Sequence, residues 1–419
     1  MLFIKDLFER PIIRSLLDID FYKFTMGQLV FNRYPDVPVT YAFRNRTVNV
    51  RLADILDLGE LKEELDLAMT LRFTKSEIHY LRGTNEYQER MFDEKYLEFL
   101  SDFQLPPYDL WTRNGQICLE FSGKWSEMIY WETIALSIIN ELYYQYLVKK
   151  LGQFGQNSVV AAGQLRLREK IERLKEKTGI TFTDFGTRRR FCRAWQDYVI
   201  ESLVQEFGDK QFLGTSNTYL AMKHDLLPTG TSAHELFVVM SGIMGETDEG
   251  ILACTNQVLK DWWEQYGRGL SIALTDTFGT NFFFKNMSAE DADKWKGLRQ
   301  DSGNPIIFGE RAIEFYRVHG IDPSQKLIVF SDGLDVDKII ALAETFSGRI
   351  KTTFGWGTNL TNDLGFKALS LVVKIVRANG QPVAKLSDNL AKAIGGSATV
   401  ERYKKIFGYA SDFSEECRY

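Results

Sequence analysis

The chain has 419 residues, a length that predicts two domains, and its 44% hydrophobic and 26% charged residues are typical of a globular protein with a substantial core. The formal charge of −5 argues against a general binder of nucleic acid or of a membrane surface, although it is compatible with a local basic pocket. No secretory leader is visible, and the longest apolar runs are well short of the roughly 20 residues that span a bilayer. The cysteines are far apart, which predicts free thiols in a cytoplasmic protein: Cys118, Cys192, Cys254 and Cys417.

Residues 1–145 have the pattern of a mixed α/β domain. Ser15 is a candidate helix N-cap, and helical spacing follows it to Phe24. Alternating apolar residues predict a strand at Val37–Phe43. The other elements expected here and just beyond are helices at 58–71, 75–82 and 93–102, strands at Gln116–Phe121 and Met128–Trp131, and long amphipathic helices at about 133–150 and 157–178.

A different pattern begins at residue 180, where short apolar strands end in Gly, Ser, Thr and Asp loops that lead into helices. Seven such units occur: Ile180–Gly186, Gln211–Ser216, Thr229–His234, Ile272–Asp276, Lys296–Ser302, Leu327–Asp332 and Ile350–Gly355. Strands that alternate with helices predict a parallel sheet, and a run of this length predicts a closed barrel. The active site of such a barrel lies at the C-terminal ends of its strands, which is where the polar residues of these units fall.

The C-terminal segment has an antiparallel character. Leu369–Val376 and Pro382–Leu386 flank an Asn379-Gly380 turn, a pattern that predicts a hairpin outside the barrel. We therefore expect an N-terminal α/β domain at residues 1–145, completed by about 366–419, and a barrel at 146–365.

The strand-end loops carry groups suited to a phosphorylated ligand. Arginine clusters and loops rich in Gly and Ser bind phosphates, and carboxylates in the same place can hold Mg²⁺ or a ribose hydroxyl. The polar groups are the basic residues Arg188, Arg189, Arg190 and Arg299 and the acids Asp184, Asp276, Asp301 and Asp332. No GxxxxGK[ST] sequence occurs, so a nucleotide would not be held by a P-loop.

His234 ends a small, hydroxylic loop, Gly230–Ala233, and opens an apolar segment. Such a loop presents backbone N–H groups to an anion, and an imidazole there can act as a general acid or base or as a nucleophile. The residues alone also fit an ordinary helix start with a histidine beside it.

The chain resembles the nicotinate phosphoribosyltransferases nearly from end to end. The motifs that carry the resemblance are Asp20–Lys23, Asp184–Phe191, Gly214–Asn217, Gly230–Glu235, Gly297–Gly303, Phe330–Asp335, Phe354–Thr358 and Val383–Asp388. The resemblance implies an incomplete seven-stranded α/β barrel with an N-terminal mixed α/β domain. It also implies that nicotinate and phosphoribosyl pyrophosphate give nicotinate mononucleotide and pyrophosphate, with Mg²⁺ and with ATP hydrolysis coupled through a phosphohistidine.

The resemblance also assigns roles to residues. It makes His234 the phosphorylated residue, and it places Tyr22 and Phe185 on either side of the pyridine ring. Arg188 and Arg299 match the basic residues at the substrate carboxylate and phosphates. The ribose-phosphate and pyrophosphate positions are matched by Asp301, Asp332, Gly333, Gly355, Gly357 and Thr358. Whether Tyr22 reaches the ring within one chain or across a homodimer is left open.

One position bears on the choice of base. The related nicotinamide enzymes have an acid at the place of Ser216, and an acid there would repel a carboxylate substrate. Ser216 followed by Asn217 therefore favours nicotinate. The chain departs from the family at Asn304, where an aspartate is usual, which puts a metal-binding role at that position in doubt. The alternatives are a nicotinamide phosphoribosyltransferase, a barrel isomerase or aldolase, and a non-catalytic sensor of phosphoribosyl ligands.

Overall fold

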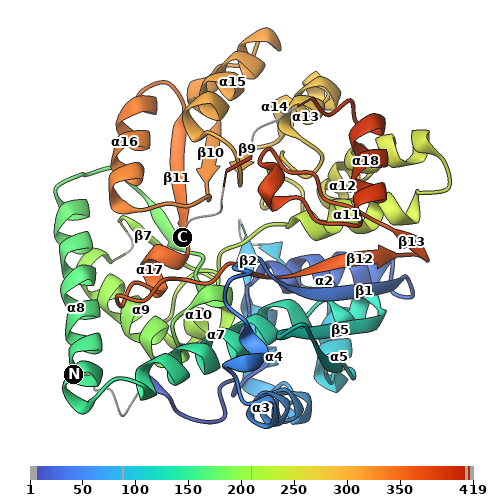
Figure 1. Ribbon diagram of the computed structural model, residues 1–419. Helices are drawn as coiled ribbons and strands as arrows, with labels where there is room; N and C mark the ends of the chain where they lie inside the picture. The colour runs from blue at the N-terminus through green and yellow to red at the C-terminus, as the bar shows by residue number, and fades with distance from the viewer. Residues whose placement is uncertain (1–6, 87–88, 209, 411–413, 416–419) are drawn as a thin grey trace.

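The computed structural model describes residues 7–86, 89–208, 210–410 and 414–415 (Figure 1). Its two main sheets are a five-stranded antiparallel sheet and a six-stranded parallel sheet, and helices cover both. The mixed α/β class expected from the sequence is confirmed. No helix within these described ranges has the length and apolar character needed to cross a membrane.

The antiparallel sheet joins the two ends of the chain. In Figure 1 the blue strand β1 (Pro38–Asn45) lies beside the orange-red strand β12 (Leu371–Ala378), and the two pair in register from Val39 with Ala378 to Asn45 with Leu371. The strand order is β13-β12-β1-β5-β4, in which β4 spans Asp109–Arg113, β5 spans Gln116–Lys124 and β13 spans Gln381–Pro382. A separate short pair consists of β2 (Asn85–Glu86) and β3 (Glu89–Arg90).

The predicted hairpin with its Asn379-Gly380 turn is present, but its second strand is only Gln381–Pro382, not Pro382–Leu386. Asn379 and Gly380 have φ angles of 50° and 75°, the left-handed pair that a two-residue hairpin turn requires. After the hairpin the chain returns to the parallel sheet, where Leu386 N–H donates to Thr277 O. Helix α18 (Ser397–Ile406) follows, and Phe407 just beyond it stacks on Phe278 at 4.2 Å between ring centroids. The boundaries at 145 and 365 stay predictions.

The helices of the N-terminal half lie close to where the sequence places them. Three of them begin at a capping side chain: Asp57 accepts from two backbone N–H groups, Thr74 forms a capping box with Glu77, and Asp93 accepts from Tyr96 N–H. Their bounds are α2 Tyr22–Arg33, α3 Leu58–Thr70, α4 Lys75–Gly83, α5 Glu94–Asp102, α6 Trp125–Met128, α7 Trp131–Lys149 and α8 Gln153–Lys175, with a 3₁₀ turn at Leu52–Asp54.

Three predictions in this half are wrong. The segment Met128–Trp131 is not a strand, since it lies at the junction of α6 and α7. Helix α7 is not amphipathic, because its residues from Trp131 to Gln145 are buried on every face of the helix. The helix predicted from Ser15 starts only at Tyr22.

The segment before α2 forms turns and one isolated bridge, Asp20 with Asn217, because it bonds to a loop of the parallel sheet. Phe21 N–H donates to Ser216 O at 2.6 Å, and Thr218 N–H donates to Ile19 O at 3.0 Å. These bonds hold residues 17–21 against residues 216–219 and override the local helical spacing. They also deliver Asp20 and Tyr22 to the C-terminal edge of the parallel sheet.

The parallel sheet has the order β7-β6-β11-β10-β9-β8. Its strands are β6 Phe182–Asp184, β7 Phe212–Thr215, β8 Ile272–Leu274, β9 Gly297–Gln300, β10 Leu327–Phe330 and β11 Lys351–Trp356. The intervening helices are α9 Arg193–Phe207, α10 Thr218–Lys223, α11 His234–Ile243, α12 Asp248–Tyr266, α13 Thr280–Asn286, α14 Ala289–Lys294, α15 Pro305–Val318, α16 Val336–Phe346 and α17 Thr358–Thr361, with 3₁₀ turns at Thr187–Arg189, Pro323–Gln325 and Leu390–Lys392.

The seventh predicted strand is reduced to one bridge. Thr215 pairs in parallel with Pro228, but the ladder does not extend into Thr229–His234. Proline lacks an N–H to donate, and Gly230 has a φ of 151°, so this segment cannot continue the pairing. The barrel is therefore open between this bridge and β8, as the resemblance implied, with six strands rather than seven.

The thiols follow the prediction where the structure describes them. Cys118, Cys192 and Cys254 are free, and Cys417 lies outside the described residues.

Candidate active site

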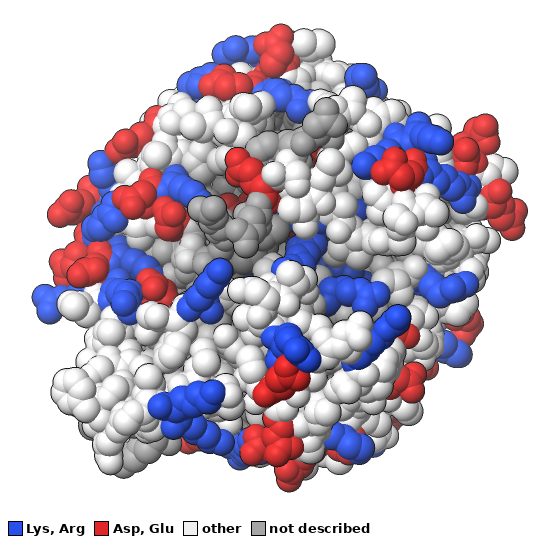
Figure 2. Space-filling model, in the orientation of Figure 1, with Lys and Arg blue, Asp and Glu red and all other residues white. Residues whose placement is uncertain are grey.

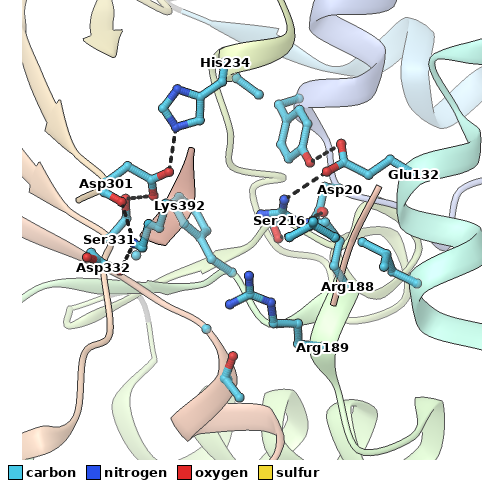
Figure 3. A pocket seen from close by; sticks show the side chains of 18 of the residues that line it. Asp20, Glu132, Arg188, Arg189, Ser216, His234, Asp301, Ser331, Asp332 and Lys392 are labelled. Carbon is cyan, nitrogen blue, oxygen red and sulfur yellow. Dashed lines mark hydrogen bonds and ion pairs between the residues drawn. The ribbon is translucent and has the colours of Figure 1, made fainter. Parts of the chain in front are cut away.

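A pocket opens at the C-terminal ends of the parallel strands (Figure 3). The starts of α2 and α7 and strand β12 form its opposite wall. All predicted site residues except Asn217 line it: Tyr22, Phe185, Arg188, Ser216, His234, Arg299, Asp301, Asp332, Gly333, Gly355, Gly357 and Thr358. The structure thus brings them together, while their individual roles stay predictions.

One end of the pocket combines aromatic rings with a shared arginine. Tyr22 and Phe185 line the pocket of the same chain, so Tyr22 does not need a second subunit to reach it. Arg188 lies 5.5 Å from the centre of the Tyr22 ring, and its Nε is 3.0 Å from Asp20 Oδ2. Ser216 Oγ donates to the other oxygen of Asp20 at 2.7 Å. Serine at this position therefore holds a carboxylate that comes from the N-terminal region.

Two glycines of β11 and its following turn allow the Phe185 ring to take this position. A Cβ on Gly355 would lie 2.3 Å from two atoms of the Phe185 ring, and one on Gly357 would lie 3.3 Å from the Phe185 carbonyl oxygen. Any side chain at Gly355 would displace the ring, so glycine at that position allows Phe185 to line the pocket.

The other end of the pocket holds the histidine. His234 begins α11, and its Nε2 lies 2.9 Å from Asp301 Oδ2, while its Nδ1 lies 3.0 Å from Thr277 Oγ1. Burial alone would raise the pKa of Asp301, but the hydrogen bond from His234 and the charge of Arg299 hold it well below its usual range. An ionised carboxylate only accepts, so Nε2 carries the proton and the Thr277 hydroxyl donates to Nδ1.

The imidazole is neutral at physiological pH. Burial lowers the pKa of His234 from 6.5 to about 4, and Lys385 adds to this effect against the opposing pull of Asp276 and Asp301. A neutral imidazole keeps a lone pair available, which a nucleophile needs.

We expect the His234 imidazole to titrate near pH 4. Because the unfolded chain binds this proton near 6.5, the contribution of His234 to stability is complete above pH 6.5 and is lost as the pH falls toward 4. Two-dimensional NMR of ¹⁵N-histidine-labelled protein, with His234→Gln to assign the signals, measures this directly. A His234 midpoint at or above the ordinary value would contradict the assignment.

The loops after β10 and β11 supply the middle of the pocket. Asp332 and Gly333 follow β10, and Gly333 has a φ of 56°, a conformation that favours glycine. Lys392, from the C-terminal segment, forms an ion pair with Asp332 and donates to Asp301 O at 2.9 Å. Ser331 Oγ donates to Asp301 Oδ1 at 2.9 Å, which holds the carboxylate that faces His234 (Figure 3).

Several candidates from the sequence belong instead to buried polar contacts. The Asn217 side chain caps α10 and donates to Asp18 Oδ1 at 2.7 Å, so it does not line the pocket. Arg190 is fully buried in an ion pair with Asp18. Asp184 accepts hydrogen bonds from Gly186, Gln196 and Thr215. These groups hold the strand-end loops in place.

Asn304 also lies away from the pocket lining. Its Oδ1 accepts from the backbone N–H groups of Ile306 and Ile307 and caps α15. Asparagine caps a helix as well as aspartate does, so the lost charge has no consequence for the cap.

Sequence reasoning missed several lining residues that come from outside the barrel units. Glu132 on α7 and Lys374 on β12 line the pocket near the aromatic end, and their separation in the chain gives no local signal of this. Lys385 lies within the Val383–Asp388 motif, so the motif could have identified it, and Arg46 lies in the basic loop after β1. Asp20 stands in the Asp20–Lys23 motif but was given no role.

The pocket is basic although the chain is acidic overall. Over the face shown in Figure 2, basic and acidic side chains are interspersed. The pocket lining, in contrast, contains seven basic residues and four acidic ones: Arg46, Arg188, Arg189, Arg299, Lys374, Lys385 and Lys392 against Asp20, Glu132, Asp301 and Asp332. This excess of positive charge suits a ligand with several negative charges.

The fold and pocket define an open α/β barrel with a basic site at its strand ends, closed by a second sheet. Family models match most of the chain, with the nicotinate phosphoribosyltransferase N-terminal domain at residues 17–140 and the nicotinate phosphoribosyltransferase family at residues 180–411. The chain belongs to the nicotinate phosphoribosyltransferase family.

Solved structures agree with this membership. A nicotinate phosphoribosyltransferase from Porphyromonas gingivalis is 31% identical, with a TM-score of 0.84 over 95% of this chain and 100% of that one. The Vibrio cholerae enzyme is 32% identical, with a TM-score of 0.85 over 97% and 96%. A putative nicotinate phosphoribosyltransferase from Saccharomyces cerevisiae is 31% identical, with a TM-score of 0.84 over 96% and 100%.

Proposed function

We propose that the protein is an ATP-coupled nicotinate phosphoribosyltransferase, which forms nicotinate mononucleotide and pyrophosphate for the salvage of nicotinate into NAD. The observation that carries the proposal is the single basic pocket with two different ends. Aromatic rings and Arg188 stand at one end and a neutral histidine beside Asp301 at the other. Family membership supports the same substrates. A cytoplasmic location and a homodimer stay predictions.

The base end fits an aromatic carboxylate. The rings of Tyr22 and Phe185 offer stacking surfaces that would fix the pyridine for attack, a proximity effect. Arg188 would receive the carboxylate, because its guanidinium lies beside the Tyr22 ring and is paired with Asp20. The pyridine nitrogen is itself the nucleophile, so the transfer needs no strong base.

The transfer step leaves negative charge on pyrophosphate. The bond from the pyridine nitrogen to the ribose C1 forms as the bond from C1 to the pyrophosphate oxygen breaks, and the oxygen keeps the electron pair. An oxocarbenium-like state lies between, as in glycoside transfer. The basic residues of the pocket, Arg299 and Lys392 among them, would stabilise the charge that grows on the leaving group.

The histidine end fits phosphoryl transfer from ATP. Once Nε2 has passed its proton to Asp301, its freed lone pair would attack the γ-phosphorus, forming an N–P bond as the bond to the β,γ-bridging oxygen breaks and ADP leaves. The proton on Nε2 has an acceptor in place, Asp301 Oδ2 at 2.9 Å. Hydrolysis of the phosphohistidine after transfer would couple ATP to product formation.

The residues beside His234 fit a magnesium ion. Asp276 Oδ1 is buried and accepts no hydrogen bond among the described residues, and oxygens of Asp276 and Asp301 lie with His234 Nε2 within 4.8 Å of one another. Mg²⁺ prefers oxygen ligands, so we propose that the two carboxylates would hold it, with phosphates and water as the other ligands. When bound, the ion would neutralise charge on the departing pyrophosphate.

One assay tests the proposal. Purified protein is incubated with phosphoribosyl pyrophosphate, Mg²⁺ and either nicotinate or nicotinamide, with and without ATP, and both nucleotide and pyrophosphate are measured. The expected result is nicotinate mononucleotide in preference to the nicotinamide product, in larger amount with ATP. Preference for nicotinamide would indicate the sister activity, and the absence of product with either base would refute the enzyme assignment.

Replacing Ser216 with aspartate is expected to shift the preference from nicotinate toward nicotinamide. The new carboxylate would lie beside Asp20, which Ser216 Oγ now contacts at 2.7 Å, and would repel the substrate carboxylate while accepting from an amide. We expect the ratio of kcat/KM for nicotinate over nicotinamide to fall at least about tenfold. Ser216→Ala removes the hydrogen bond without adding charge and serves as the control. An unchanged ratio in Ser216→Asp would contradict the role.

A further inference from the structure

Lys23 is a buried cation that the mechanism does not use. It follows Tyr22 in the first turn of α2, and none of its side chain is exposed to solvent. Its Nζ lies 2.5 Å from Glu235 Oε2 and 2.8 Å from Glu132 Oε2. Burying an ammonium group is unfavourable unless its partners are well placed, so these two carboxylates define where Lys23 can lie.

Glu235 ties this lysine to the histidine. It follows His234 in the first turn of α11 and is itself buried. Its other oxygen accepts from Tyr41 Oη at 2.5 Å and from Trp125 Nε1 at 2.9 Å. With both oxygens engaged, Glu235 fixes the helical turn that presents the imidazole to Asp301 (Figure 3).

Glu132 ties the same lysine to the base end. It lies in the first turn of α7 and accepts from Lys374 Nζ at 2.6 Å and from Arg188 Nη1 at 3.4 Å. The Tyr22 hydroxyl also lies 3.4 Å from its Oε2. Burial opposes ionisation, but Lys23, Lys374 and Arg188 hold the pKa of Glu132 well below its usual range. Glu132 therefore fixes the groups that would meet the substrate carboxylate and ring.

We propose that Lys23 is a positioning residue that couples the state of His234 to the base-binding end of the pocket. A phosphoryl group on Nε2 adds negative charge and ends the direct contact with Asp301, which changes the first turn of α11. Because Glu235 shares that turn, the change reaches Lys23 and then Glu132 and Arg188. Fully satisfied buried polar networks are rigid, so a displacement of Glu235 would also move Lys23 and Glu132. This inference rests on the proposed function.

The decisive variant is Lys23→Met with Glu235→Gln. It removes one positive and one negative charge together, so it leaves no unpaired carboxylate, while Glu132 keeps Lys374 and Arg188. The KM for nicotinate with and without ATP, kcat, and labelling of the protein from γ-³²P-ATP are measured in parallel. In the wild type, ATP is expected to lower this KM at least about fivefold. In the double variant that ratio falls below about twofold, while labelling persists.

Two further variants make the result specific. Glu235→Gln alone keeps an acceptor for Tyr41 and Trp125 and is expected to weaken the effect of ATP on the KM. It also provides a test if the double variant does not fold. Lys62→Met with Asp66→Asn removes an exposed ion pair of α3 and is expected to keep the wild-type ratio. If the double variant keeps the full wild-type effect of ATP on the KM for nicotinate, Lys23 is only structural. If the double variant does not fold, the same result with Glu235→Gln leads to the same conclusion. A wild type that makes no nucleotide from nicotinate refutes the proposed function instead.

Discussion

His234→Ala is expected to abolish phosphoryl transfer from ATP to the protein and to remove the stimulation of nucleotide formation by ATP. The variant lacks the imidazole, whose Nε2 lies 2.9 Å from the proton acceptor Asp301. Loss of an attacking group lowers such rates by at least about a thousandfold. Acid-labile, base-stable labelling from γ-³²P-ATP measures the step, and product formation with and without ATP measures the coupling.

The matched control is His224→Ala. His224 pairs with Asp197 at 2.7 Å and is not among the residues that line the pocket. We expect this variant to be labelled and stimulated as the wild type is. If the His234→Ala protein is still labelled, another residue is the phosphoryl acceptor and the assignment of the histidine end fails.

Asp301→Asn is expected to slow phosphorylation of His234 by about a hundredfold or more, the usual contribution of a positioned proton acceptor. An amide cannot take the proton from Nε2. Its NH₂ group would also donate to Nε2, which favours the tautomer with the proton on Nδ1 and occupies the lone pair that must attack. The variant further loses one of the two carboxylates proposed to hold Mg²⁺. The rate of labelling in a single turnover is the measurement.

Asp337→Asn provides the comparison for Asp301→Asn. Asp337 is an exposed carboxylate of α16 that pairs with Arg173 at the surface. It is expected to leave the labelling rate unchanged, since exposed ion pairs contribute little. A labelling rate for Asp301→Asn within about threefold of the wild type would show that the proton leaves by another route.

The rule that such active sites lie at the C-terminal ends of parallel strands explains why so much of the pocket could be predicted. Asp301 directly follows β9 and Asp332 lies two residues after β10, and parallel strands bring their C-terminal ends to one edge. The same rule overreached at Asn217 and Arg190. Both follow strands, but both turn toward Asp18 in a buried polar network. A pattern of polar residues does not distinguish a side chain that faces a ligand from one that satisfies a neighbour.

The opposite wall of the pocket could not be predicted from local signals. Glu132 lies in the first turn of a helix that the sequence predicted to be amphipathic but that is mostly buried, and Lys374 is one of two charged residues in the otherwise apolar strand β12. Each meets the pocket only because β12 pairs with β1, across more than three hundred residues of sequence, and because α7 packs beneath them. The helix predicted from Ser15 failed for the same reason, since residues 17–21 bond to residues 216–219 instead of continuing a helix.

From the sequence alone came the class of fold, the alternation of strand and helix, the family, and the residues that stand at the strand ends. These follow from hydrophobic periodicity, turn residues and motifs, which are local properties of the chain. The packing of distant segments, in contrast, set three features: Tyr22 lines its own chain's pocket, Ser216 Oγ donates to Asp20, and the pKa of His234 is lowered to about 4. Burial and the distances between charges set these features, and both arise only when distant segments pack together.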